Sequence, residues 1–141
     1  MTYGCESWKS TTSLENKLNA FENKCLRKIT NTNWKDFKSN ETLREETKQE
    51  YITDVIRKRR WEYIGHALRM NEDRIPRQVF TWSPSGKRKR GRPKTTLKRT
   101  IEKEITTAGM KMNDLEQLAV DRQAWRAMIS ALCAKLGTRG K

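Results

Sequence analysis

The apolar residues between Tyr51 and Met70 constrain the fold more than any other feature of this sequence. They recur at spacings of three and four residues, which is the period of an α-helix. One face would carry Ile52, Val55, Ile56, Tyr63, Ala67 and Met70, and another would carry Trp61, Ile64 and Leu68. A helix with two apolar faces must pack against something on both sides. We therefore predict a central helix here.

Two other N-terminal segments and one later segment also predict helices. A capping-box pair, Thr12 and Glu15, would begin a helix that ends near Asn31 and carries an apolar stripe of Leu14, Leu18, Phe21, Cys25 and Ile29. Ser39 or Asn40 would cap a short polar helix through Leu43. From Thr95 or Thr96, a further helix would carry Leu97, Ile101, Ile105 and Ala108 on one face and would end at Gly109.

The C-terminal segment has heptad-like spacing. After a cap pair, Asn113 and Glu116, a stripe repeats at alternating steps of three and four residues: Leu115, Leu118, Arg122, Trp125, Ile129, Leu132 and Leu136. Arg122 is its one polar member. We expect a monomer, and the alternative is pairing of two chains through the Leu115–Leu136 stripe.

These segments predict an all-α protein in three regions. Residues 1–72 would form a helical region and residues 95–141 a second one. Residues 73–94 would form a basic linker, because all three prolines fall there: Pro76, Pro84 and Pro93. Within the linker, Gln78–Trp82 would be a short extended segment and Ser83–Gly86 a turn.

The charge of the chain predicts an anionic partner. Lys and Arg number 31 against 17 Asp and Glu, which gives a net charge of +14. One stretch from 87 to 99 contains no acidic residue and holds Lys87, Arg88, Lys89, Arg90, Arg92, Lys94, Lys98 and Arg99. Such a stretch displaces counterions from a phosphate backbone, so we predict DNA or RNA as the partner. An anionic membrane surface is the lesser alternative.

The sequence shows no arrangement of residues that is typical of a catalytic or metal-binding site. The chain has one histidine, His66, and three widely spaced cysteines, Cys5, Cys25 and Cys133. No carboxylate pair has the setting of a two-metal site, and no glycine-rich loop could hold a phosphate. We therefore predict no catalytic residue, no metal, no cofactor and no small-molecule substrate. No apolar run is long enough to cross a membrane, and the odd number of cysteines suits an intracellular protein.

Within the basic stretch, Lys89–Lys94 reads Lys-Arg-Gly-Arg-Pro-Lys, which resembles the core of an AT-hook. Glycine would let the backbone approach the floor of the minor groove, and arginine would seek its negative potential. A solvated basic loop and a nuclear localisation signal are the alternatives. We expect a nuclear protein.

Several motifs in order resemble one family. Tyr3–Trp8, Leu18–Ile29 and Arg57–Met70 resemble the region after the polymerase palm of non-LTR (LINE-type) retrotransposon reverse transcriptases. Gly91–Thr96, Ala119–Arg126 and Ala131–Cys133 look like the C-terminal end of the same polyproteins. The resemblance covers nearly the whole chain and implies a thumb-like region over residues 1–72 and a C-terminal helical region.

The chain departs from that family where the chemistry is carried out. It has no Asp-Asp pair for polymerase metals, no endonuclease residues and no Cys-Cys-His-Cys zinc knuckle. We interpret it as a non-catalytic remnant, translated from a truncated copy, that grips template–primer or target DNA by its backbone. A stand-alone chromatin-associated protein and an inert helical interaction module are the alternatives.

The predicted phosphate contacts lie in two places. One is the central helix, with Arg57, Lys58, Arg59 and Arg60, for which a merely solubilising surface is the alternative. The other is the set Lys87, Arg88, Lys89, Arg90, Arg92, Lys94, Lys98 and Arg99. Trp61 and Trp125 could stack on bases, but we expect them in the core, since both lie on apolar stripes.

Overall fold

The computed structural model describes residues 2–80, 82, 91 and 96–137. These residues form α-helices and two 3-10 helices without any strand, which confirms the all-α prediction. The 3-10 helices are η1 (Cys5–Ser7) and η2 (Trp34–Asp36). The α-helices are α1 (Thr12–Ile29), α2 (Asn40–Thr47), α3 (Ile52–Leu68), α4 (Ile75–Gln78), α5 (Leu97–Ala108), α6 (Met112–Val120) and α7 (Arg122–Gly137).

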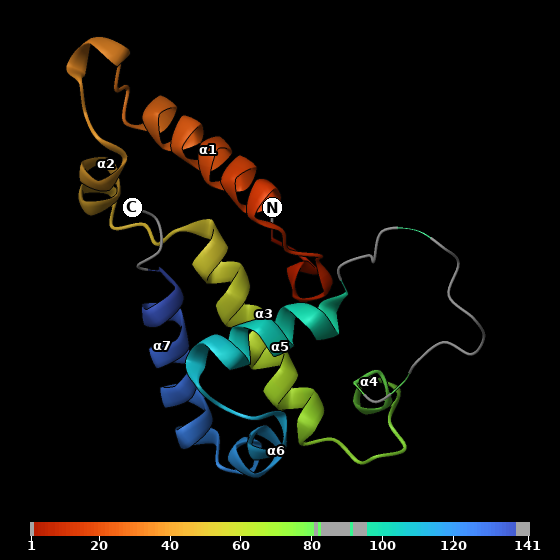
Figure 1. Ribbon diagram of the computed structural model, residues 1–141. Coiled ribbons are helices and arrows are strands. Elements are labelled where there is room, and N and C mark those ends of the chain that lie inside the picture. The colour runs from red at the N-terminus through yellow and green to blue at the C-terminus, as the bar shows by residue number, and fades with distance from the viewer. Residues whose placement is uncertain (1, 81, 83–90, 92–95, 138–141) are drawn as a thin grey trace.

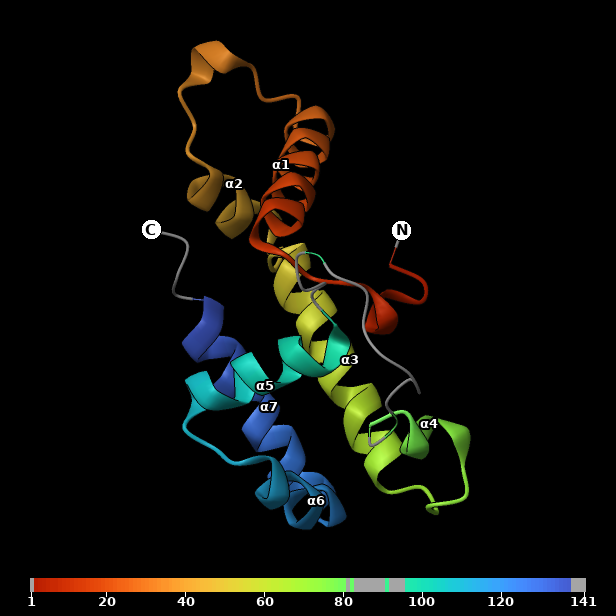
Figure 2. The same ribbon diagram turned by 45° about the vertical axis from the view of Figure 1, so that its right-hand side comes forward.

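Helix α3 is the centre of the fold, as its two apolar faces predict. Figure 1 shows α5 crossing α3 and α7 running alongside, while α1 and α2 extend away from the first turns of α3. Figure 2 keeps the same arrangement after rotation. On one side, Ile52 and Ile56 of α3 pack with Cys5 and Leu18. On the other side, Trp61 and Ile64 join the larger cluster. Tyr63 is the exception among the predicted core residues, since 43% of it is exposed.

The larger core joins α3 to the three C-terminal helices. Its fully buried members besides Trp61 and Ile64 are Ile101, Ile105, Leu115, Ala119, Trp125, Ile129 and Leu132. The rings of Trp61 and Trp125 lie 6.0 Å apart at 52°. Trp125 Nε1 donates to the backbone oxygen of Trp61 at 3.1 Å. Both tryptophans are therefore core residues, as predicted.

Gly65 permits this close approach of α7 to α3. A Cβ built at Gly65 would lie 2.2 Å from Trp125 Nε1, far inside van der Waals contact. Residue 65 must therefore lack a side chain for the tryptophan to reach the backbone of α3. This glycine sits in a helix, where it costs helical propensity, so the packing accounts for its presence.

Helix α1 does not bury the stripe that the sequence predicts. Leu14, Phe21 and Ile29 are 44%, 48% and 78% exposed, so the prediction of a core-facing stripe is wrong for these three. A different face carries the buried Leu26. The N-cap lies one residue before the predicted Thr12, because it is the Thr11 side chain that accepts from the Leu14 amide, at 3.4 Å.

The short helix α2 and helix α5 begin at predicted caps. The Ser39 hydroxyl accepts from the Thr42 amide at 3.1 Å. The Thr96 hydroxyl accepts from the Arg99 amide at 3.4 Å. Gly109 ends α5 with a left-handed φ of 79°, which glycine adopts without strain.

The predicted C-terminal stripe is split between two helices. The Asn113–Glu116 cap is wrong, since Lys111 is the N-cap of α6 and its amide donates to the Asp114 carboxylate at 3.3 Å. The stripe breaks at Asp121, whose carboxylate accepts from the Gln123 and Ala124 amides at 2.7 and 3.2 Å. The capping residue Asp121 therefore divides this segment into two helices, although its apolar period continues across the break.

The region after α3 also differs from the prediction. The described part of the predicted extended segment is not extended: α4 ends at Gln78, the Phe80 amide donates to the Arg77 oxygen at 3.3 Å, and the Trp82 amide donates to the Gln78 oxygen at 2.8 Å. The predicted turn at 83–86 lies outside the described residues. Hydrophobic contacts cross the expected division at residue 72, since α3 packs against α6 and α7, and Trp61 and Ile64 of α3 share a core with Ile101 and Ile105 of α5.

Candidate nucleic-acid interface

The structure separates the four predicted contacts of the central helix. Successive helical residues turn by about 100°, so four in a row cannot share one face. Lys58 and Arg59 are exposed, while the Arg57 side chain is mostly buried, with 11% exposure, and Arg60 retains 2%. Lys58 and Arg59 therefore remain accessible to a polyanion, and Arg60 leaves the set of candidate phosphate contacts.

Arg60 is buried because α5 supplies its counterion. Its guanidinium is paired with the Glu104 carboxylate. The second carboxylate oxygen accepts from Trp61 Nε1 at 2.7 Å. Arg57 reaches the same carboxylate at 3.7 Å and Asp54 at 2.5 Å. A buried arginine needs such a partner, so these contacts assign Arg60 to the packing of α3 on α5.

Arg59 is exposed, and its hydrogen bond to the N-terminal segment leaves its guanidinium accessible to a polyanion. Its guanidinium donates to the Thr2 hydroxyl at 2.6 Å, which ties the N-terminal segment to α3. This neutral contact does not cancel its charge. Arg59 can therefore still add positive potential to the surface around η1.

Of the second predicted set, only Lys98 and Arg99 fall on described residues. Both are exposed in the first turn of α5. The positive end of the helix dipole lies at the same turn and adds to their charge. The other six, Lys87, Arg88, Lys89, Arg90, Arg92 and Lys94, lie outside the described residues, as does most of the AT-hook-like motif.

The fold also brings together three arginines that the sequence prediction missed, at the corner where α3 ends and α7 begins. Arg69 Nη1 donates to the Ala119 backbone oxygen at 2.9 Å, which holds its guanidinium beside the α6–α7 turn. Arg122 and Arg126 are exposed one turn apart on α7. We call Arg69, Arg122 and Arg126 the basic corner.

Like charges meet at the basic corner without a counterion in the described part of the chain. Partial burial lowers the pKa of Arg69, and the charges of Arg122 and Arg126 lower it further. Among the described residues, no carboxylate forms an ion pair with any of these three. Arg69 and Arg74 also line an open hollow of about 450 Å³. An anion would relieve the repulsion between these charges.

A second hollow carries more acidic than basic side chains, which does not suit a polyanion. A groove of about 750 Å³ between α3 and α7 is lined by Glu50, Asp54 and Glu62 together with Lys58, Arg126 and Cys133. Burial raises the pKa of Asp54 against the opposing effect of Arg57. Burial also raises the pKa of the Cys133 thiol, which keeps it protonated and weakly nucleophilic near neutral pH.

Metal ligands do not assemble among the residues described. No group of three or more His, Cys, Asp and Glu side chains comes together there. Within the same residues, none of the helices has the length and apolar character needed to span a bilayer. Comparisons with protein-family models, curated proteins and solved structures found no match to this chain.

Proposed function

We propose that this protein binds nucleic acid through backbone phosphates and is a non-catalytic remnant of a non-LTR retrotransposon reverse transcriptase. The observation that carries the binding proposal is the basic corner, where three arginines converge with no described counterion. Lys58, Arg59, Lys98 and Arg99 are further exposed cations. The net charge of +14 supports the same class of partner.

The assignment to a retrotransposon remnant rests on the ordered motifs alone. They imply thumb-like helices that grip a template–primer duplex, while the sequence has no Asp-Asp pair for polymerase metals. Phosphate contacts position a protein on nucleic acid without reading its sequence. Binding of duplex DNA and RNA–DNA hybrid with little sequence preference is the expected activity, and primer extension by this chain should be absent.

Salt dependence of binding tests this proposal. Affinity for a labelled duplex should be measured by fluorescence anisotropy across a salt series. If all eight basic residues of the 87–99 stretch contact phosphates, they should contribute ~−7 to the slope of log affinity against log salt. Arg90→Gln with Arg92→Gln should flatten it by roughly two units, and so should Arg122→Gln with Arg126→Gln.

A matched double variant serves as the control. Lys48→Gln with Lys103→Gln removes the same charge from exposed positions, the C-cap of α2 and the middle of α5, outside the basic corner and the 87–99 stretch. Its slope should stay close to that of the unmodified protein. Failure of the unmodified chain to bind DNA, RNA or hybrid at low ionic strength would refute the proposal.

A stand-alone DNA-binding protein is the second candidate, and the Arg90–Pro93 motif favours it. This candidate predicts stronger binding to A·T duplex than to G·C duplex or hybrid, because the minor groove of A·T tracts is narrow and strongly negative. Equal affinity for the three would exclude it.

A further inference from the structure

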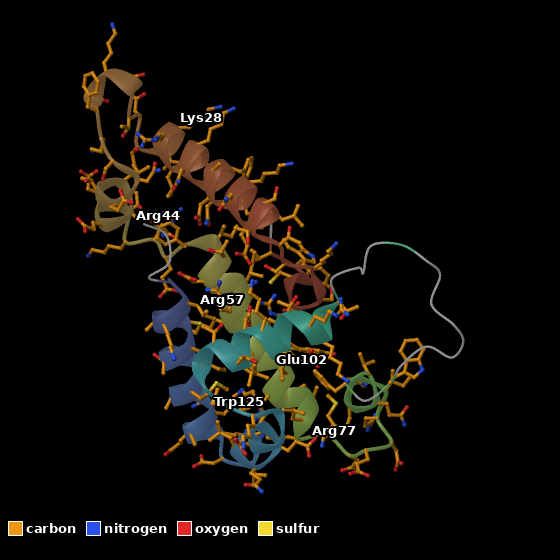
Figure 3. The ribbon with its side chains drawn as sticks, in the orientation of Figure 1. Lys28, Arg44, Arg57, Arg77, Glu102 and Trp125 are labelled. Atoms are coloured by element: carbon orange, nitrogen blue, oxygen red, sulfur yellow. The ribbon has the colours of Figure 1, made fainter. Side chains whose placement is uncertain are left out.

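One face of α1 keeps its side chains exposed within the described part of the chain. Leu14, Lys17, Phe21, Lys24 and Lys28 follow each other at steps of three and four residues, so they form one stripe, and all five are exposed. Leu14 and Phe21 keep 44% and 48% of their surface. Figure 3 shows Lys28 pointing out from α1 on the side away from α2.

The acidic residues of α1 lie on a different face and are already partnered. Glu15 accepts from the Ser10 hydroxyl. Glu22 pairs with Arg44 at 2.6 Å and accepts from the Ile52 amide at 3.1 Å. The exposed stripe is therefore basic along its length, and α1 itself supplies no carboxylate to neutralise it.

A second aromatic side chain extends this face at the start of the helix. Trp8 is 37% exposed and, with Lys9 and Leu14, lines a hollow between α1 and α3 to which Glu15 also contributes. Two aromatic rings, Trp8 and Phe21, and four lysines thus lie between the end of η1 and the last turn of α1. From Lys17 to Lys28 the helix rises by ~16 Å, a distance that covers several backbone phosphates.

We propose that Trp8, Lys9, Lys17, Phe21, Lys24 and Lys28, which we call the α1 platform, bind single-stranded nucleic acid. Bases stack on the rings of Trp8 and Phe21, and the lysines contact phosphates. Stacking on aromatic side chains together with a basic track is how proteins hold single strands without sequence preference. A duplex hides its base faces in its own stack, so the rings favour a single strand over a duplex.

This inference deepens the proposed function and rests on nucleic acid being the partner. The apolar and basic composition also fits an amphipathic helix lying on an anionic membrane. The charges favour nucleic acid, because the lysines lie within the same stripe as Leu14 and Phe21 rather than on the opposite face of the helix. A membrane-surface helix would separate its charged and apolar residues onto two faces.

Fluorescence anisotropy with a labelled oligothymidylate and a duplex of equal length tests the platform. Phe21→Ala should weaken binding of the single strand by about fivefold or more and change duplex binding much less. Phe37→Ala is the matched control, since Phe37 is 88% exposed but lies outside the platform. It should leave both affinities unchanged.

The lysines are tested by the salt dependence of single-strand binding. Lys17→Gln with Lys24→Gln should flatten the slope by ~1.4 units, at about 0.7 per phosphate contact on a single strand. The control is again Lys48→Gln with Lys103→Gln, which removes equal charge from exposed positions outside the platform. Circular dichroism should confirm that all variants remain folded.

The outcomes separate this inference from the proposed function. Binding of both nucleic acids that is unaffected by the Phe21 and lysine substitutions overturns the platform but leaves the proposed function standing. No binding by the unmodified protein overturns both. Association with phosphatidylserine vesicles that Phe21→Ala abolishes, with single-strand affinity unchanged, would assign this face to a membrane instead.

Discussion

At the scale of single residues, Arg60 and Glu104 illustrate how neighbours in the sequence can have opposite roles. Arg59 is exposed, and the next residue is enclosed between α3 and α5 with a carboxylate partner. Because Glu104 also accepts from Trp61 Nε1, one carboxylate satisfies two buried donors. Loss of that carboxylate would leave both donors buried without an acceptor.

Glu104→Leu should therefore lower the free energy of unfolding by about 3–5 kcal/mol, measured by urea denaturation, because it strands the Arg60 charge. Adding Arg60→Met should recover part of the loss, since it removes the stranded charge. Glu102→Leu is the control, because Glu102 is exposed on the same helix (Figure 3), and it should stay within about 0.5 kcal/mol. Strictly additive effects of the two core substitutions would contradict this account.

At the scale of elements, Arg44 holds the α1–α2 arm together and attaches it to α3. Its guanidinium pairs with Glu22 at 2.6 Å, donates to Asn23 Oδ1 at 2.7 Å and donates to the Glu50 oxygen at 3.1 Å. It also lies 3.9 Å above the ring of Tyr51. Figure 3 shows Arg44 where α2 faces α1 and the start of α3. One side chain thus joins α1, α2 and the turn that leads into α3.

Arg44→Ala should loosen α2 without unfolding the core around Trp61 and Trp125. Hydrogen exchange should accelerate in α2 and in the adjoining turns of α1, because the contacts that join these segments are lost. Protection in α3 and α7 should persist. Lys48→Ala, an exposed change in the same arm, should leave exchange unaltered beyond its own turn. Uniform loss of protection over the whole chain would contradict the prediction.

At the scale of the whole molecule, the C-terminal stripe is used within one chain. Leu115, Trp125, Ile129 and Leu132 are each at most 3% exposed, because they pack against α3 and α5. A second copy could reach them only if the core opened. The alternative of pairing through Leu115–Leu136 therefore requires partial unfolding.

Sedimentation equilibrium should accordingly give a mass near 16.6 kDa over a wide range of concentrations. Addition of a single-stranded oligonucleotide should raise that mass by the oligonucleotide alone. A stable dimer in the absence of nucleic acid would contradict the prediction and would direct attention to the exposed apolar residues of α1.

Local sequence patterns were enough to predict which segments are helical and where several of them begin and end. Hydrophobic period, the Ser39 and Thr96 caps and the left-handed Gly109 are local properties, so they survive any tertiary arrangement. The two-faced character of α3 likewise predicted a central helix. The net charge of +14 likewise follows from the composition alone.

Which helix faces are buried, and which charged side chains become neighbours, depends on how the helices pack. The spacing of apolar residues identifies a stripe on a helix but does not show whether another helix covers that stripe. Phe21, for example, is exposed although its spacing suits a core. The counterion of Arg60 is Glu104, which lies 44 positions further along the chain. Arg69 met Arg122 and Arg126 through the packing of α3 on α7. These outcomes depend on contacts between distant segments, and local sequence patterns carry no information about such contacts.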